Sequence, residues 1–277
     1  MEQLNLSPGP IGIFDSGFGG LSILKQIRLL MPEYDYLYLG DNARTPYGSR
    51  SFQVVYEYTL QCVQKLFQMG SNLVIIACNT ASAKALRTIQ QKNLDVSSGR
   101  RVLGIIRPTA ECVGTLTKNK HIGILATPGT VISDSYTIEI GKLFPDVVVS
   151  QQECPMLVPL VESGEISSSG TDFFVRKYVQ SLLEKDNLID TIILGCTHYP
   201  ILYDTIRRYV PQNIRIVTQG EYVAQSLNNY LLRHSALEKC ITRGGSCSYY
   251  TTESVENFLR VARIFMEQDV KAQTISL

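Results

Sequence analysis

The sequence has almost no excess of charge of either sign, with 26 Lys and Arg against 25 Asp and Glu in 277 residues. Proteins that bind nucleic acid through its phosphates usually carry a clear basic excess or stripe, so this balance argues against a nucleic-acid partner. No apolar run reaches the roughly 18 residues of a membrane span, and residues 1–10 lack the pattern of a secretory signal. We therefore expect a cytoplasmic protein that makes no membrane contact.

Histidine is scarce as well, with three residues, and they form no close cluster with cysteine at metal-ligand spacing. The seven cysteines are odd in number and widely spread, unlike the disulfide framework of a small secreted protein. The glycine-rich turn at 15–20 fits neither the dinucleotide fingerprint nor the phosphate-binding loop. These absences predict reduced thiols and no metal, and they give nucleotide binding little support.

What the sequence does have is a regular alternation of two patterns. Short apolar runs at 11–14, 34–39, 73–77 and 102–106 alternate with helical spacing at 21–30, 50–68 and 80–91. This alternation is typical of a parallel sheet with helices on both faces.

The alternation then restarts. The segment 122–130 resembles 11–19, and the segment around Cys196 resembles the one around Cys78. Any α/β chain repeats an apolar strand and a glycine loop, but two matched pairs in the same order favour an internal duplication. We predict two similar parallel-sheet α/β domains in pseudo-twofold relation, with the active site in the cleft between them. The first domain comprises 1–107 with 217–277, and the second comprises 108–216; the section from 217 onward is predicted to be mostly helical.

The two cysteine segments are the most informative feature. Cys78 ends the run Leu-Val-Ile-Ile-Ala-Cys and Cys196 ends Thr-Ile-Ile-Leu-Gly-Cys. Each thiol lies where a strand gives way to a helix, and helix N-termini favour thiolates. A single such cysteine is more often simply buried. Two in equivalent settings favour two reactive thiols that face one substrate from opposite sides.

Other candidate residues have two interpretations each. Asp15 lies at the end of the first strand, where it would act as a base or orient an ammonium group, and the backbone N–H groups of the turn that follows would hold a small anion. Alternatively, Asp15 or Ser16 only caps a helix. His198 lies two residues after Cys196 and would share a proton with it or only hydrogen-bond at a strand end. Glu162 lies in an apolar stretch as a buried acid or on an exposed edge, and Thr45–Gly48 is a turn whose polar groups are able to hold a ligand.

Several motifs give the chain a resemblance to a known family. They are Phe14-Asp-Ser-Gly-Phe-Gly-Gly-Leu, Asp41-Asn with Pro46-Tyr-Gly, Ala77-Cys-Asn-Thr-Ala-Ser, Gly195-Cys-Thr-His-Tyr-Pro and Tyr250-Thr-Thr-Glu-Ser. Over nearly its whole length the chain resembles the glutamate racemases, cofactor-independent members of the aspartate/glutamate racemase superfamily. One departure is Arg107-Pro-Thr, where many relatives have Glu-Pro-Gly; it puts a positive charge at the predicted hinge.

The resemblance implies a two-base mechanism that converts L-glutamate to D-glutamate without a cofactor. One thiolate removes the α-proton and the opposite thiol reprotonates the other face, Cys78 acting on D-glutamate and Cys196 on L-glutamate. Asp15 would assist Cys78, while His198 and Glu162 would assist Cys196. The substrate contacts implied are Asp15, Ser16, Tyr47, Gly48, Asn79, Thr80, Thr130, Thr197 and His198. The product would supply peptidoglycan synthesis for the cell wall, and we expect a homodimer.

Two other functions remain open. A relative that acts on aspartate or another acid would share most of these motifs, although Cys-Thr-His-Tyr-Pro favours glutamate. A non-catalytic α/β module that binds an acidic ligand would bind without exchanging the α-proton, but binding alone does not need paired thiols.

Overall fold

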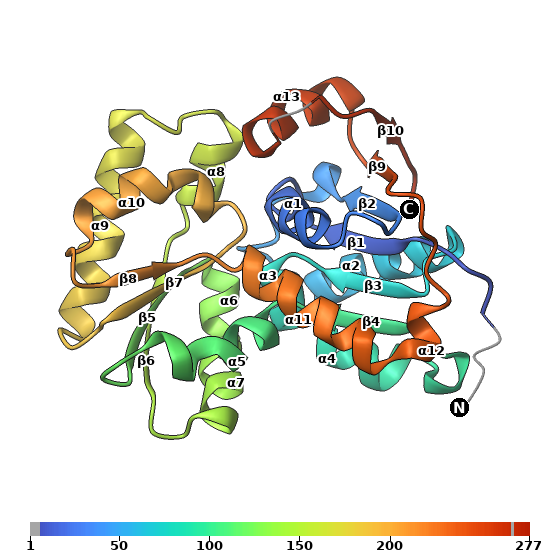
Figure 1. Cartoon of the computed structure of the whole chain (residues 1–277). Coiled ribbons are helices and arrows are strands. Elements are labelled where there is room, and N and C mark those ends of the chain that lie inside the picture. Colours follow the sequence, from blue (N-terminus) through green and yellow to red (C-terminus); the bar gives the residue numbers. More distant parts are fainter. Residues whose placement is uncertain (1–5, 267–268) are drawn as a thin grey trace.

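The computed structural model describes residues 6–266 and 269–277, in which the chain forms two β-sheets. The first sheet has the strand order β10-β9-β2-β1-β3-β4 and the second β6-β5-β7-β8, and every paired strand is parallel. Figure 1 shows the sheets side by side, each accompanied by helices. The predicted fold class, with two parallel-sheet α/β units, is confirmed.

The strands are β1 (Ile11–Asp15), β2 (Tyr36–Gly40), β3 (Leu73–Ile76), β4 (Arg101–Gly104), β5 (His121–Ala126), β6 (Val148–Glu153), β7 (Thr191–Gly195), β8 (Arg215–Val217), β9 (Cys247–Thr251) and β10 (Ala272–Thr274). The helices are α1 (Gly20–Leu30), α2 (Phe52–Gln68), α3 (Asn79–Lys84), α4 (Leu86–Thr88), α5 (Ile106–Leu116), α6 (Pro128–Ile132), α7 (Ser135–Leu143), α8 (Leu157–Glu162), α9 (Ser169–Lys185), α10 (Tyr203–Tyr209), α11 (Gly220–Arg233), α12 (Ser235–Glu238) and α13 (Val255–Phe265). Short helical turns are η1 (Asn42–Arg44), η2 (Ile89–Asn93), η3 (Val96–Ser98) and η4 (Tyr199–Leu202).

The two sheets repeat one topology. The order β2-β1-β3-β4 in the first sheet matches β6-β5-β7-β8 in the second, so β3 and β7 occupy equivalent places. Parallel α/β sheets bind ligands beyond the carboxyl ends of their strands, where the strand order reverses. Cys78 lies two residues beyond β3 and Cys196 directly beyond β7. The shared order supports the duplication and puts both thiols at ligand-binding edges.

Both faces of the first sheet are buried at its central strands β1, β2 and β3, which explains why these strands are continuously apolar. Successive side chains point to opposite faces. Ile13 packs in the same cluster as Leu24 of α1, whereas Phe14 packs with Val63 and Leu66 of α2. The sheet edge that carries the functional residues is therefore held from both sides.

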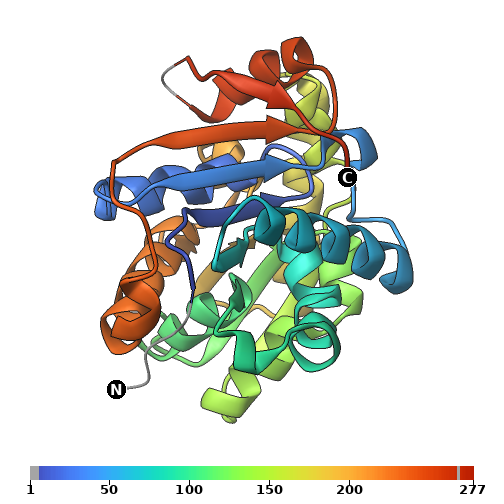
Figure 2. The same ribbon diagram turned by 90° about the vertical axis from the view of Figure 1, so that its right-hand side faces the viewer.

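The section from 217 onward differs from the prediction. It contains helices α11 and α13, but also β9 and β10, and β9 pairs with β2. Figures 1 and 2 show these red C-terminal strands beside the blue N-terminal ones. Cys247–Thr251 is short, and its strand form comes from pairing with a distant segment rather than from its own pattern.

The predicted strand 102–106 is also shorter than expected. β4 ends at Gly104, and Ile106 already begins α5, because a short apolar run cannot distinguish a strand from a buried helix turn. The predicted boundary at 107 therefore falls inside α5, and that at 217 falls on the last residue of β8. Arg107 lies in α5 and pairs with Glu111 and Glu139, both at 3.0 Å.

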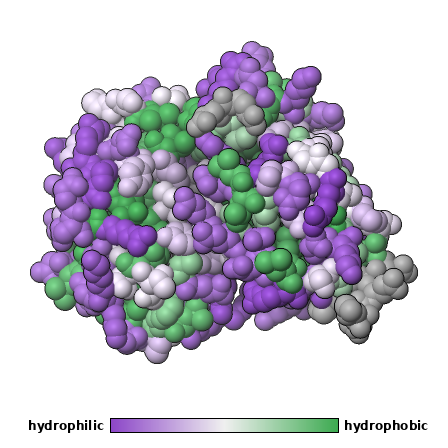
Figure 3. All heavy atoms as spheres, in the orientation of Figure 1, coloured by the Kyte–Doolittle hydropathy of each residue, from purple (hydrophilic) through white to green (hydrophobic). Residues whose placement is uncertain are grey.

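In 6–266 and 269–277, no helix is long and apolar enough to cross a lipid bilayer. On the face drawn in Figure 3, apolar residues occur in separate groups among polar ones.

Candidate active site

A cavity of about 140 Å³ lies between the two sheets, against residues that follow the carboxyl ends of their strands. It is much smaller than the roughly 300–1,000 Å³ of typical sites for drug-sized ligands, so it suits a small metabolite. The sequence-predicted residues in its wall are Ser16, Tyr47, Gly48, Cys78, Asn79, Thr80, Cys196, Thr197 and His198. The fold thus brings together candidates that are up to 182 positions apart in the sequence.

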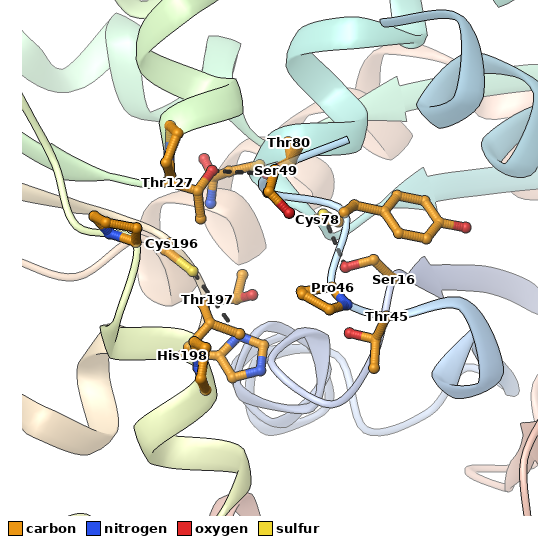
Figure 4. A pocket seen from close by; sticks show the side chains of 17 residues that line it. Ser16, Thr45, Pro46, Ser49, Cys78, Thr80, Thr127, Cys196, Thr197 and His198 are labelled. Atoms are coloured by element: carbon orange, nitrogen blue, oxygen red, sulfur yellow. Dashed lines mark hydrogen bonds between the residues drawn. The ribbon is translucent and has the colours of Figure 1, made fainter. Parts of the chain in front are cut away.

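The two thiols lie on opposite sides of this cavity, as Figure 4 shows. Both cysteines are buried, and each is 6% exposed. Little bulk water therefore reaches either sulfur atom, which strengthens the electrostatic interactions of both.

Cys78 is the N-cap of α3. Its sulfur accepts hydrogen bonds from the Ser16 hydroxyl at 3.2 Å and from the Ala81 N–H at 3.4 Å. Burial and the nearby Asp15 carboxylate nevertheless raise the pKa of Cys78 to about 12, outweighing these two donors. At neutral pH, the Cys78 thiol therefore keeps its proton.

Cys196 has a different partner, because a histidine follows it. The sulfur lies 3.8 Å from Nδ1 of His198, and Nε2 of His198 lies 2.9 Å from Oε1 of Glu162. Burial opposes a charge on His198, but the hydrogen bonds to Cys196 and Glu162 outweigh it and raise the pKa of His198 to about 10. An imidazolium beside the sulfur is suited to hold negative charge there.

Three predicted site residues lie outside the cavity wall in the described part of the chain: Asp15, Thr130 and Glu162. Asp15 is buried behind the wall, accepts the Gly17 N–H at 2.9 Å, and has its pKa raised by burial. Thr130 contacts Thr127 at 3.1 Å, and Glu162 reaches the site through His198. Direct substrate contact by Asp15 and Thr130 stays a prediction.

Thr45 and Pro46 of the predicted turn also lie in the wall. The wall contains further residues that sequence reasoning missed: Ser49, Thr127, Pro128, Pro155, Val158 and Pro159. One of them had a signal in the sequence. The repeat that matches 11–19 to 122–130 matches Ser16 to Thr127, so the duplication alone points to Thr127. Thr127 lies 2.8 Å from Thr80 across the two units.

The loop 45–49 in this wall is anchored by Asp41, which is fully buried at the end of β2. Asp41 accepts the Tyr47 hydroxyl and lies 2.6 Å from Nε of Arg44. The Gly48 carbonyl also accepts the Gly129 N–H from the second unit at 2.7 Å. The loop therefore connects the two units over the cavity.

Comparison with known proteins gives the family. Residues 21–226 match the Asp/Glu/hydantoin racemase family. The chain belongs to this family. It is a racemase, and the family predicted from the motifs is confirmed.

The sequence matches between this racemase and its relatives cover nearly its whole length. It is 35% identical to a glutamate racemase of Streptococcus agalactiae, with 97% of this chain and 98% of the relative covered. It is 36% identical to one of Persephonella marina, with 96% and 97% covered. Among solved structures, a Bacillus anthracis glutamate racemase, RacE1, matches with a TM-score of 0.88 at 31% identity over 97% of this chain and 98% of that one. A Francisella tularensis glutamate racemase in complex with D-glutamate matches at 0.85 and 29% identity over 98% of both chains.

The pair formed by His198 and Glu162 gives this racemase a testable pH dependence. Glu162→Gln removes the carboxylate that helps to raise the pKa of His198, so we expect that pKa to fall below about 10. Since the folded-state pKa is raised, the pair stabilises the fold fully below about pH 6.5 and loses this effect as pH rises through about 10. In Glu162→Gln the loss still begins near pH 6.5, but it should be smaller and complete at a lower pH.

NMR titration of labelled imidazoles measures this shift directly, because the chain has three histidines. Asp186→Asn is the matched control: it removes a carboxylate 2.8 Å from His121 and leaves His198 with its partner. An unchanged His198 titration in Glu162→Gln would show that the carboxylate does not support the imidazolium.

Proposed function

We propose that this racemase interconverts L- and D-glutamate without a cofactor, by proton transfer between two thiols. The observation that carries the proposal is the arrangement of two buried cysteines, Cys78 and Cys196, on opposite sides of one small cavity. The full-length relatives described above are glutamate racemases, which supports glutamate as the substrate.

The chemistry follows from the two sulfur atoms. A thiolate on one side takes the α-proton and becomes a thiol, leaving the electron pair on Cα. The thiol on the other side then donates its proton to the opposite face and becomes a thiolate. One turnover inverts the stereocentre and exchanges the protonation states of the two cysteines, and no group has to change faces.

The surroundings of the two sulfur atoms support one assignment of their roles. Cys78 holds its proton, because burial raises its pKa to about 12, while Cys196 has the His198 imidazolium beside it. A thiolate at Cys196 and a thiol at Cys78 are the pair that L-glutamate requires, if Cys196 faces the L-enantiomer. We propose that His198 and Glu162 assist Cys196 and that Asp15 assists Cys78.

The polar wall supplies the substrate contacts in this proposal. Ser16, Asn79, Thr80 and Thr197 present hydroxyl and amide groups to the cavity, beside Tyr47, Gly48 and His198. Hydrogen bonds to the substrate carboxylates hold the α-carbon between the sulfur atoms and stabilise the charge that develops during proton removal. We further propose that the product serves peptidoglycan synthesis and that the chain acts in the cytoplasm as a homodimer.

Turnover of both amino acids tests the function. The purified chain, with no cofactor added, should convert L-glutamate to an equal mixture of the two enantiomers, as measured by chiral chromatography. It should turn over aspartate far more slowly. Faster turnover of aspartate than of glutamate would mean that aspartate is the substrate. Glutamate binding without α-proton exchange would favour the non-catalytic module.

A further inference from the structure

A closed ring of three hydrogen bonds lies behind the cavity. The Asn79 amide donates to Oε1 of Gln219 at 2.7 Å, and the Gln219 amide donates to the Tyr136 hydroxyl at 2.7 Å. The Tyr136 hydroxyl completes the ring by donating to Oδ1 of Asn79 at 2.8 Å. All three side chains are buried, with exposures of 2% or less.

The direction of the ring is fixed from outside it. The Thr109 hydroxyl donates to the Ile105 carbonyl at 3.0 Å, so its oxygen is free only to accept from Gln219, at 2.9 Å. The nitrogen of the Gln219 amide must therefore face Thr109 and Tyr136, and its oxygen must face Asn79. Burial raises the pKa of Tyr136, which keeps its hydroxyl protonated as a donor.

The ring therefore sets which way the Asn79 amide points. An amide has two N–H donors and two oxygen lone pairs, and the ring occupies one of each. Asn79 also lines the cavity, directly after Cys78, so one N–H and one lone pair remain for a ligand. A reversed amide would leave buried polar groups unpaired, at a cost of about 1–3 kcal/mol each.

The ring also joins parts that are distant in the chain. Asn79 begins α3 beside the first sheet, Tyr136 lies in α7 of the second unit, and Gln219 lies between β8 and α11. Its three members thus come from the two units and from the segment where the chain returns to the first unit.

We infer that Gln219 and Tyr136 are positioning residues that hold the Asn79 amide in the orientation that receives the substrate. This inference rests on the proposed function, since the ligand concerned is glutamate. Neither residue was among the sequence candidates, and Tyr136 does not line the cavity in the part of the chain that the structure describes.

Tyr136→Phe tests the inference because it removes the hydroxyl that two of the hydrogen bonds share and keeps the aromatic part of the side chain. We expect the KM for glutamate to rise about tenfold, with a smaller change in kcat. This is the size of effect that the loss of one or more well-placed hydrogen bonds has. In an Asn79→Ala background, the same substitution should leave KM unchanged, because it acts only through Asn79. An equal rise of KM in both backgrounds would overturn the inference.

Tyr36→Phe is the matched control. It removes a buried hydroxyl that donates to the Met31 carbonyl at 2.6 Å. Tyr36 begins β2, at the end of the strand away from the cavity, so the KM of this variant should equal that of the wild type. A folded Tyr136→Phe protein with wild-type KM would also contradict the inference. Folding is checked by thermal unfolding of both variants.

Gln219→Glu supplies a second test that does not depend on Tyr136→Phe folding. A carboxylate cannot donate to Tyr136 or Thr109, whereas a protonated carboxyl can, so the KM defect should shrink as pH falls. A defect that does not vary with pH would count against the inference.

A readout without turnover separates this inference from the proposed function. In protein labelled with ¹⁵N-asparagine, the Asn79 side-chain amide proton that is bonded to Gln219 should be protected from exchange with water and should lose this protection in Tyr136→Phe. Failure of the wild type to racemise glutamate would reject the function alone. Equal exchange rates in the wild type and in Tyr136→Phe would show that the ring of hydrogen bonds does not orient the Asn79 amide.

Discussion

Serine at either Cys78 or Cys196 is expected to lower racemisation of glutamate by about 10²–10⁴-fold, the usual contribution of a positioned acid or base. A hydroxyl is a far weaker acid than a thiol, and each turnover needs both groups. The loss must be equal in the two directions, because enantiomers have equal free energies in water and the ratio of the two kcat/KM values is therefore fixed at one. Chiral chromatography from each enantiomer measures both rates.

The two variants should differ in what they retain. Cys78→Ser keeps the thiol at Cys196 and should still exchange the α-hydrogen of L-glutamate with solvent, without inversion. Cys196→Ser should do the same with D-glutamate. The control is Cys112→Ser, which changes a half-buried thiol on α5 whose sulfur contacts the Pro108 carbonyl and which should leave the rates unchanged. Full activity in either active-site variant would end the two-thiol mechanism.

Gly19→Ala is expected to lower kcat/KM by about 100-fold, the effect that a displacement of about 1 Å has on catalytic geometry. A Cβ at Gly19 would lie 2.3 Å from Oγ1 of Thr197 and 2.4 Å from Nδ1 of His198. Both side chains would have to move, and His198 would lose its place beside Cys196. The Gly19 backbone is helical, with φ −59° and ψ −32°, so alanine itself adds no backbone strain.

Gly141→Ala is the matched control for this prediction. Gly141 lies in α7, and a Cβ there would meet nothing within 4 Å. This change should raise the free energy of unfolding by about 0.5–1 kcal/mol, since alanine favours helix over glycine, and should leave kcat/KM unchanged. Steady-state kinetics and thermal unfolding of Gly19→Ala and Gly141→Ala measure both effects. A wild-type kcat/KM in Gly19→Ala would contradict the geometry of the site.

The parts of the site that the sequence predicts are those that follow single strands. Cys78 and Cys196 were identifiable because each ends an apolar run, and the end of a buried parallel strand is where such folds expose polar groups. Asp15 and Ser16 were identifiable for the same reason. The repeat also predicted the equivalent positions of β3 and β7.

The rest depends on contacts between distant segments. Pro155 and Val158 reach the cavity only because the second unit packs against the first, and Tyr136 meets Gln219 only in the folded chain. No local pattern records such contacts. The strand β9 was missed for the same reason, since its partner β2 lies some 200 residues earlier.

The most direct test of the two-thiol mechanism is the early time course of L-glutamate racemisation in deuterium oxide, followed by mass spectrometry of the separated enantiomers. With two bases on opposite faces, the D-glutamate formed first should carry one deuterium at Cα, while the remaining L-glutamate should stay almost free of label. Unlabelled D-glutamate, or deuterium that appears equally fast in both enantiomers, would mean that one base serves both faces and would contradict the roles given to Cys78 and Cys196.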